Sequence, residues 1–303
     1  MMKKKYFGVY NGLKKGCGLF ALLLLLPALI NFLWLWGYPN ISSIFLSFQD
    51  SNGEWTVGNY TWVWGQLFGE DGESIMAEAL KNTLTYFFVG YFITNAWNII
   101  VAYFLFKQLK FHRAFRFILN LPTMLAGLIM VTLYKNMIGP EGPIIQFLYN
   151  NGIISEQYML LFDSRFAMPA SVMYGVWLCI GGPYLWASAA MARIPKEVLE
   201  AAEIDGVSPF REFVQIILPL ISGTLSTLYI IGISGILNAG GATLYLTYGE
   251  FGTMTLSFWL FKQIYENAGT GTTSALGLMM SAVTIPLVYL VKRIAAMLPD
   301  VSY

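Results

Sequence analysis

Six long apolar stretches, each free of Asp, Glu, Lys, Arg and His, constrain this chain more than any other feature of its sequence. They cover residues 17–36, 82–106, 117–134, 167–192, 213–246 and 274–291. A helix needs roughly 20 apolar residues to cross a hydrocarbon layer about 30 Å thick. Only 12% of the residues are charged, which is about half the share found in soluble domains. The sequence therefore predicts an all-α integral membrane protein with six transmembrane helices.

The basic residues indicate which way these helices point. If the N-terminus is inside, 14 of the 18 lysines and arginines fall in inside segments, and the exceptions are Lys81, Lys135, Arg165 and Lys262. The positive-inside rule then places both termini in the cytoplasm, an N-in/C-in topology. The first apolar stretch is longer than a typical signal-peptide core and no Ala-x-Ala-like site follows it, so we expect a retained span.

The same stretches exclude several function classes. Ion-driven carriers generally need ionisable groups within the membrane, and these stretches have none. The chain also lacks the Gly-x-x-x-x-Gly-Lys-Ser/Thr phosphate cradle, a nucleophile elbow and a His/Cys/Asp cluster. Cys17 and Cys179 lie far apart in apolar runs, which favours two buried thiols over a disulfide. We therefore expect no catalytic residue, no metal site, no cofactor in this chain and no enzymatic activity of its own.

Amides and aromatic rings supply the polarity inside the predicted membrane spans. The candidates for a substrate path are Asn95, Asn98, Trp177, Tyr184 and Asn238. Aromatic faces and amides suit a sugar, but hydrogen bonds between helices are the alternative for the two asparagines of the second span. Gly181, Gly182 and Pro183 are expected to interrupt the fourth span.

A charged stretch between the fourth and fifth spans has the pattern of two short helices joined by a sharp turn. Residues 196–205 are expected to form the first helix, and Gly206 to end it in the left-handed conformation that glycine tolerates best. Ser208 is expected to cap the second helix, with Pro209 in its first position. Pro219 marks the entry into the membrane.

This helix pair could lie on the lipid surface or bind a protein partner. Its acidic residues, Glu200 and Glu203 among them, disfavour an anionic membrane surface. Exposed apolar side chains on a rigid helix pair are typical of a segment that fits into a partner's groove. The sequence therefore favours protein docking.

The same stretch resembles the EAA signature of ABC importer permeases. Glu200, Ala201 and Ala202, then Gly206, and after nine residues Ile216 with Leu218 and Pro219, match the signature without a gap. The form Asp205-Gly206 with Leu218-Pro219-Leu220 is most similar to the carbohydrate-uptake branch, the maltose and glycerol-phosphate type. The resemblance covers residues 82–293. Val207 departs from the usual alanine, and residues 246–252 lack the common Thr-Gly-Gly-Pro motif.

The resemblance implies a type I ABC importer permease fold with a cytoplasmic coupling helix between spans 4 and 5. The expected parts are a cytoplasmic N-terminus (1–16), the first span TM1 (17–36), an external loop (37–81), a core permease domain TM2–TM6 (82–294) with its EAA loop (193–219), and a cytoplasmic tail (295–303). By resemblance, the residues that couple the chain to an ATPase are Glu200, Ala201, Ala202, Asp205, Gly206, Ile216, Leu218 and Pro219.

The resemblance also implies a function and a set of partners. The chain is expected to be the permease subunit of a binding-protein-dependent importer in a bacterial or archaeal cytoplasmic membrane, and to carry a mono- or oligosaccharide. Two separate ATPase subunits would hold ATP and Mg²⁺. A second, similar permease subunit forming a heterodimer, an extracytoplasmic solute-binding protein and membrane lipid would be the other partners, with no nucleic acid. The alternatives are a homodimer in place of the heterodimer, a glycerol-phosphate or polyol permease, an autonomous carrier, and a membrane scaffold that recruits a protein other than an ATPase.

Overall fold

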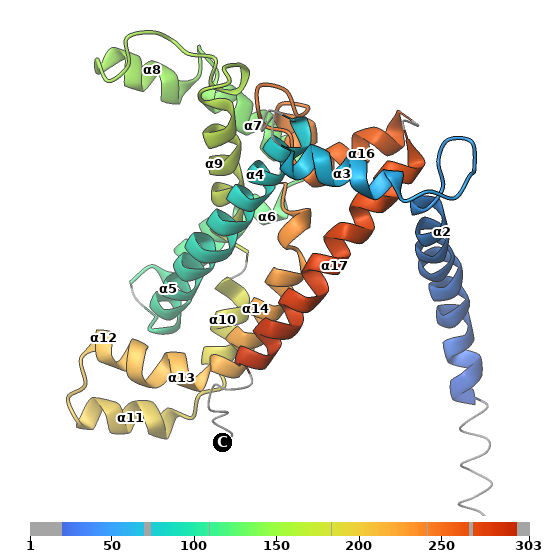
Figure 1. The fold of residues 1–303 in the computed structure, drawn as a ribbon. Helices are drawn as coiled ribbons and strands as arrows, with labels where there is room; N and C mark the ends of the chain where they lie inside the picture. Colours follow the sequence, from blue (N-terminus) through green and yellow to red (C-terminus); the bar gives the residue numbers. More distant parts are fainter. Residues whose placement is uncertain are drawn as a thin grey trace, which may run out of the picture. The chain divides into compact units, whose positions relative to one another are not determined.

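A computed structural model describes residues 20–69, 74–108, 110–182, 184–240, 242–266 and 269–295 (Figure 1). Throughout these residues the regular structure is helical, and the only β-type pairing is an isolated bridge between Gln49 and Trp55. The expectation of an all-α chain is confirmed. The described residues form two compact units, one of 20–63 with 269–278 and one of 64–266 with 279–295.

The first unit contains a helix that begins the described chain. It runs through a π-helical turn, Leu33–Gly37, into α2 (Tyr38–Ser47), so it continues beyond the end at 36 that the apolar pattern predicted. Pro39 lies inside this helix without ending it, and the π turn Leu33–Gly37 shortly before it changes the hydrogen-bond pattern where the proline N–H is missing. Residues 1–16 and the predicted start of this span at Cys17 lie outside the described residues.

Side chains at the start of α3 (Gly58–Phe68) form hydrogen bonds with the end of α2. The Asn59 side chain donates to the carbonyl oxygens of Ser47 (3.0 Å) and Gln49 (2.8 Å), and the hydroxyls of Ser47 and Tyr60 are 2.8 Å apart. These bonds satisfy the carbonyls left over at the end of α2. Each unit also holds part of α3 (Gly58–Phe68) and α17 (Thr270–Ala295). The stretch predicted as an external loop is thus largely helical.

The longest helix of the second unit runs from Ile75 to Phe106. It consists of α4 (Ile75–Phe88), a π-helical turn (Val89–Thr94) and α5 (Asn95–Phe106). It begins before residue 82, where the apolar stretch starts, because the Ser74 hydroxyl caps it by accepting from the Ala77 N–H at 3.1 Å. A polar first turn is therefore added to the predicted span.

The third apolar stretch is not one straight helix. It contains α6 (His112–Met124) and α7 (Gly127–Ile138), and the chain bends by 104° between α6 and the segment Gly127–Asn150, which also includes α8 (Pro143–Asn150). Leu125 and Ala126 are extended at the bend. Pro122 lacks the N–H for its helical hydrogen bond, which weakens α6 two residues before its end.

The fourth stretch is interrupted as the glycines predicted. It contains α9 (Ala167–Cys179) and α10 (Tyr184–Met191), with Gly181 and Gly182 between them and Pro183 outside the described residues. A Cβ on Gly181 would stand 1.5 Å from the Leu119 carbonyl oxygen of α6. Only glycine allows the two backbones to come this close.

The fifth stretch also bends. The segment Pro209–Leu220 meets α14 (Ser222–Ser234) at 70°, and a short 3₁₀ turn (Ile236–Asn238), α15 (Thr243–Leu246) and α16 (Leu256–Tyr265) follow. Within the described residues three helices are long and apolar enough to cross a membrane, or five if each bent pair is one span. The fourth stretch adds no further span by that measure, because its helices are short.

Two buried clusters hold the second unit together. One joins α5 and α10 to residues of the helix pair between α10 and α14, through Ala102, Tyr184, Met191, Ile217 and Ile221 among others. The other joins α7, α9 and α15 around Tyr134 and Tyr174. The first cluster attaches the charged helix pair to the membrane helices.

Candidate functional site

The EAA segment, residues 193–219, begins with a helix whose end is fixed by backbone hydrogen bonds. This helix, α11, spans Lys196–Ile204, and Asp205 is its C-cap residue. Gly206 follows with φ +69°. The N–H of Val207 donates to the Ala202 carbonyl and the N–H of Gly206 to the Glu203 carbonyl, both at 3.0 Å. This pair of bonds is a Schellman motif, which requires the left-handed residue at Gly206. The predicted turn is confirmed.

The second helix of the EAA segment starts where the sequence predicted, but its cap differs. Ser208 is extended (φ −67°, ψ 151°) and Pro209 is the first helical residue of α12 (Pro209–Arg211). The Ser208 side chain makes no capping hydrogen bond, so the predicted side-chain cap is wrong. Its carbonyl accepts from the Glu212 N–H at 2.9 Å instead. The helix continues through a π-helical turn (Glu212–Ile217) into α13 (Leu218–Leu220).

The two helices of the EAA segment lie next to each other at one end of the second unit, joined by the Gly206 turn (Figure 1). Their inner side is apolar: Ala202 and Ile217 are buried, and Val198, Leu199 and Phe213 pack against the α5–α10 cluster. The two alanines of the motif therefore differ, because Ala202 packs inward while Ala201 is exposed.

The outer side of the EAA segment combines acidic groups with large apolar ones. Glu200, Asp205 and Gly206 are exposed, as is Pro219, while Ile216 and Leu218 are half-buried. Ile204 is 86% exposed and Phe210 is 76% exposed. Two large apolar side chains on either side of the turn, with carboxylates beside them, form a surface that suits a protein groove.

Two side chains from the end of α5 hold the second helix of the EAA segment. The Tyr103 hydroxyl donates to the Pro209 carbonyl at 3.0 Å, and its ring lies 4.9 Å from that of Phe213. One turn further on, Lys107 Nζ lies 2.6 Å from Glu212 Oε1. The Glu212 side chain is 9% exposed and that of Lys107 is 38% exposed. We call this group the α5 anchor: Tyr103, Lys107, Pro209, Glu212 and Phe213.

The predicted substrate-path residues lie in different surroundings in the structure. Asn98 is buried, and its amide donates to the Thr94 carbonyl of its own helix (2.8 Å) and to the Cys179 carbonyl (3.0 Å). The bond to Cys179 is the interhelical bonding considered as the alternative. Asn95, one turn earlier, is half-buried, and Asn238 is exposed at the end of its 3₁₀ turn. Asn98 thus links α5 to the end of α9.

The two predicted aromatic residues lie in different surroundings. Trp177 stacks on Tyr134 with ring centroids 5.9 Å apart and meets Tyr174 edge to face at 6.2 Å. Tyr184 is fully buried, and its hydroxyl accepts from the Asn120 amide of α6 at 2.7 Å. Both residues therefore contribute to helix packing in this conformation.

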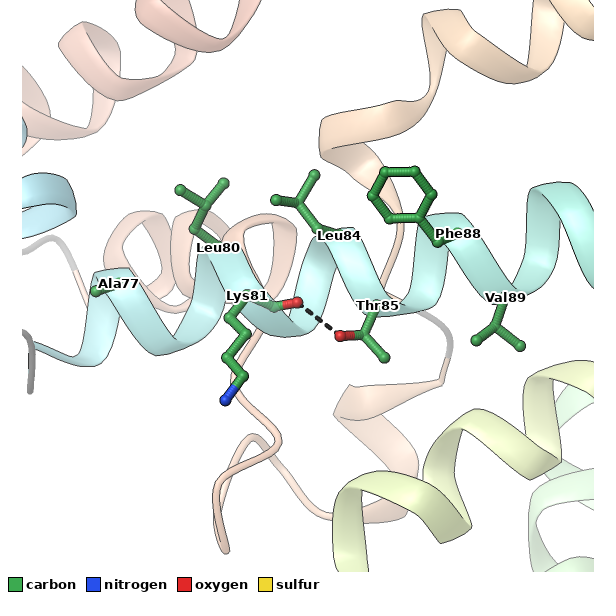
Figure 2. A pocket seen from close by; sticks show the side chains of 7 residues that line it. All are labelled: Ala77, Leu80, Lys81, Leu84, Thr85, Phe88 and Val89. Carbon is green, nitrogen blue, oxygen red and sulfur yellow. Dashed lines mark hydrogen bonds between the residues drawn. The ribbon is translucent and has the colours of Figure 1, made fainter.

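A cavity of about 500 Å³ lies along one side of α4 and the residue after it (Figure 2). Its lining residues are Ala77, Leu80, Lys81, Leu84, Thr85, Phe88 and Val89. The Thr85 hydroxyl donates to the Lys81 carbonyl of the same helix at 2.9 Å. This is an apolar helix face and contains none of the five predicted path residues. Among the described residues, no group of three or more His, Cys, Asp or Glu side chains could hold a metal ion.

Comparison with known proteins identifies the family. The model of the family described as "Binding-protein-dependent transport system inner membrane component" matches residues 99–299. The chain belongs to this family. It is therefore an inner-membrane component of a binding-protein-dependent ABC transport system, as the EAA resemblance predicted.

Individual relatives agree with this assignment. The probable ABC transporter permease protein YesP of Bacillus subtilis is 27% identical over 84% of this chain and 83% of its own length. The arabinooligosaccharides transport system permease protein AraP of Halalkalibacterium halodurans is 24% identical over 85% and 81%. A bacterial ABC transporter involved in alginate import has a chain with the same fold, with a TM-score of 0.82 and 21% identity over 96% of this chain and 99% of that one.

The α5 anchor is the part of the permease that the sequence did not predict. Lys107 had counted only toward the orientation, and Glu212 had no assigned role. One signal was available: Glu212 is a carboxylate at the membrane boundary, with Arg211 before it and an apolar run after it, and such a group normally has a partner. The sequence could not name that partner, because Lys107 is 105 residues away.

Proposed function

We propose that this chain is the transmembrane permease subunit of a binding-protein-dependent ABC importer that moves a mono- or oligosaccharide across the bacterial cytoplasmic membrane. The observation that carries the proposal is the exposed EAA segment in a chain of this family. The named cargo of AraP is an arabinooligosaccharide and that of the structural relative is alginate. Because both are carbohydrates, we favour a sugar over a glycerol-phosphate or a polyol.

The proposed assembly follows from what this chain lacks. It has no phosphate-binding loop of its own, so two ATPase subunits would hold ATP and Mg²⁺. A second, similar permease would complete the translocation path, and an extracytoplasmic binding protein would deliver the cargo. The chain would have six spans with both termini in the cytoplasm, with TM1 at 17–36 and the core permease domain at 82–294.

The geometry suggests how ATP hydrolysis could act on the membrane helices. In the proposal, the outer side of the EAA segment docks into an ATPase, with Glu200, Ala201, Asp205 and Gly206 at the contact. Movement of the segment would reach α5 through the α5 anchor, and would reach α10 and α14 through the cluster around Ile217 and Ile221. The membrane helices would then alternate between inward-facing and outward-facing arrangements.

The first experiment is purification of the tagged chain in mild detergent, followed by mass spectrometry of the proteins that accompany it. We expect a P-loop ATPase and a second permease. Reconstitution of that complex with its binding protein should give ATP-dependent uptake of a labelled oligosaccharide. Purification of a folded chain alone, with uptake independent of ATP, would instead support an autonomous carrier.

A further inference from the structure

A cavity of about 380 Å³ opens beside the EAA segment, where the end of α5, the start of α6 and α10 meet. Its lining residues are Leu105, Phe106, Gln108, His112, Arg113, Arg116, Ser188 and Ala192. None of the eight is acidic. The volume lies within the range of ordinary small-ligand sites. The cavity is therefore large enough for a phosphorylated headgroup.

The positive charge of this cavity is not neutralised by the described part of the chain. The ion pairs among the described residues are Lys107–Glu212 and Asp163–Arg165, so neither Arg113 nor Arg116 has a carboxylate partner. Arginine presents several N–H donors in a fork that matches the oxygens of a phosphate. Glu212, the carboxylate of the neighbouring EAA segment that is buried, is paired with Lys107 and not with these arginines.

A second polar group independently indicates a ligand. The Ser188 hydroxyl oxygen is buried and has no hydrogen-bond partner among the described residues, although Ser188 lines the cavity. A buried hydroxyl without a partner is costly, and a ligand oxygen would satisfy it. The helix α6 also begins here without an acidic residue in its first turn, which favours a negative group at this end.

The flanks of the cavity favour a lipid over a soluble phosphate compound. Phe111 is 78% exposed, and Phe117 and Ile118 are each 62% exposed along α6. Exposed Phe and Ile side chains on a helix that also carries arginines are typical of the boundary between lipid and water. Two cavity walls, Leu105 and Phe106, are apolar as well. From these observations we infer that the cavity binds the phosphate headgroup of an anionic phospholipid, with Arg113, Arg116 and Ser188 as the contacting residues.

The inference rests on the proposed function in one respect, the choice of the leaflet that the cavity faces. The proposed topology places the cavity at the cytoplasmic leaflet, where basic pockets between helices can bind anionic headgroups. Headgroup binding needs neither ATP nor a sugar. A test of lipid binding can therefore fail while the importer proposal stands, and the reverse also holds.

The test is lipid binding by the purified importer complex, measured by native mass spectrometry with phosphatidylglycerol and with phosphatidylcholine. The variant is R113Q/R116Q. Both arginines are exposed, so the variant should fold, and its melting temperature checks this. The matched control is K292Q/R293Q, which removes two exposed positive charges from the end of α17, outside the cavity. A hydrogen bond to a charged group contributes about 1.5 kcal/mol, so the loss of two arginine contacts to the phosphate should weaken phosphatidylglycerol binding about 100-fold.

Five outcomes decide the inference. Weaker phosphatidylglycerol binding in R113Q/R116Q alone, with phosphatidylcholine unaffected, supports it. An equal loss in K292Q/R293Q, or no preference for phosphatidylglycerol in the wild type, overturns it. Displacement of the lipid by millimolar inorganic phosphate would show that the site takes free phosphate and would overturn the lipid assignment. The variant S188L fills the cavity without changing the charge, and unchanged binding in it would overturn the placement of the headgroup.

Discussion

Replacing Lys107 by methionine should destabilise the permease by about 2 kcal/mol. This cost follows from how much of the Lys107 and Glu212 side chains is exposed to solvent. Breaking a fully buried ion pair costs about 3–5 kcal/mol, because a charge is left without a partner. An exposed pair contributes only about 0.2–1 kcal/mol. Here Glu212 is 9% exposed while Lys107 is 38% exposed, so the pair lies between these limits.

The same reasoning predicts an asymmetry between the two partners. Lys107→Met leaves a carboxylate in a site that water hardly reaches. Glu212→Gln leaves an ammonium group that can turn toward water, since more than a third of its side chain is already exposed. We therefore expect Glu212→Gln to cost less than about 1 kcal/mol. In the double variant K107M/E212Q the two costs should not add, with a coupling energy of about 1–2 kcal/mol.

Thermal unfolding of the purified complex in detergent gives the order of stabilities. Cargo-stimulated ATP hydrolysis in proteoliposomes then shows whether the α5 anchor carries movement as well as stability. We expect Lys107→Met to retain the ATPase subunits but to lower transport per ATP hydrolysed. Equal destabilisation by both single variants, or additive costs in the double variant, would refute the argument that the burial of Glu212 dominates.

Three further predictions concern positions where the backbone or a charge decides the outcome. Gly206→Val should cost roughly 1–2 kcal/mol through left-handed strain alone, because a Cβ there meets nothing within 4 Å; cargo-stimulated ATP hydrolysis should fall, whereas Gly206→Asn should keep most of it. Gly181→Ala should cost about 3 kcal/mol or more by collision with a carbonyl, while Gly175→Ala, in an open helical position, should be neutral or stabilising in thermal unfolding. Hydrogen bonds from the Arg165 guanidinium lower the pKa of Asp163 from 3.8 to about 2. The stability that this ion pair contributes is therefore present above pH 3.8 and is lost as the pH falls toward 2. Arg165→Gln should move the pKa of Asp163 back toward 3.8 in a ¹³C-aspartate NMR titration.

Local chemistry made part of the fold predictable. Gly206 follows an amphipathic helix and precedes Pro209, which leaves few conformations for the turn, and the Schellman bonds have the expected form. The glycines at 181 and 182 likewise predicted the break between α9 and α10. These features depend on residues within one or two turns of each other, so a single sequence contains the information.

Bends within apolar runs were less predictable. Hydropathy indicates whether a segment prefers lipid, but it contains no information on the direction of the helix axis. The 104° bend at Leu125 and Ala126 was therefore not predicted, although Pro122 lies close to it. The first helix was predicted to end too early for a related reason. Pro39 and Asn40 look like a stop signal, but the Asn40 amide donates to the Trp36 carbonyl at 2.6 Å and supports the helix there.

The candidate site shows the same division between local and distant information. The motif predicted the turn of the EAA segment, because the residues that form the turn lie within a few positions of one another in sequence. The α5 anchor depends on a contact between residues 107 and 212, and no local pattern encodes that. In the proposed mechanism the anchor would matter as much as the motif for force transfer. A docking surface without an attachment to the membrane helices would move by itself, and the described attachment at the start of the second helix is made by Tyr103 and Lys107. A carboxylate placed at a membrane boundary is costly unless it is paired, so the pairing of Glu212 with Lys107 makes separation of the EAA segment from α5 unfavourable. In the proposed mechanism a displacement of the EAA segment would therefore also displace α5.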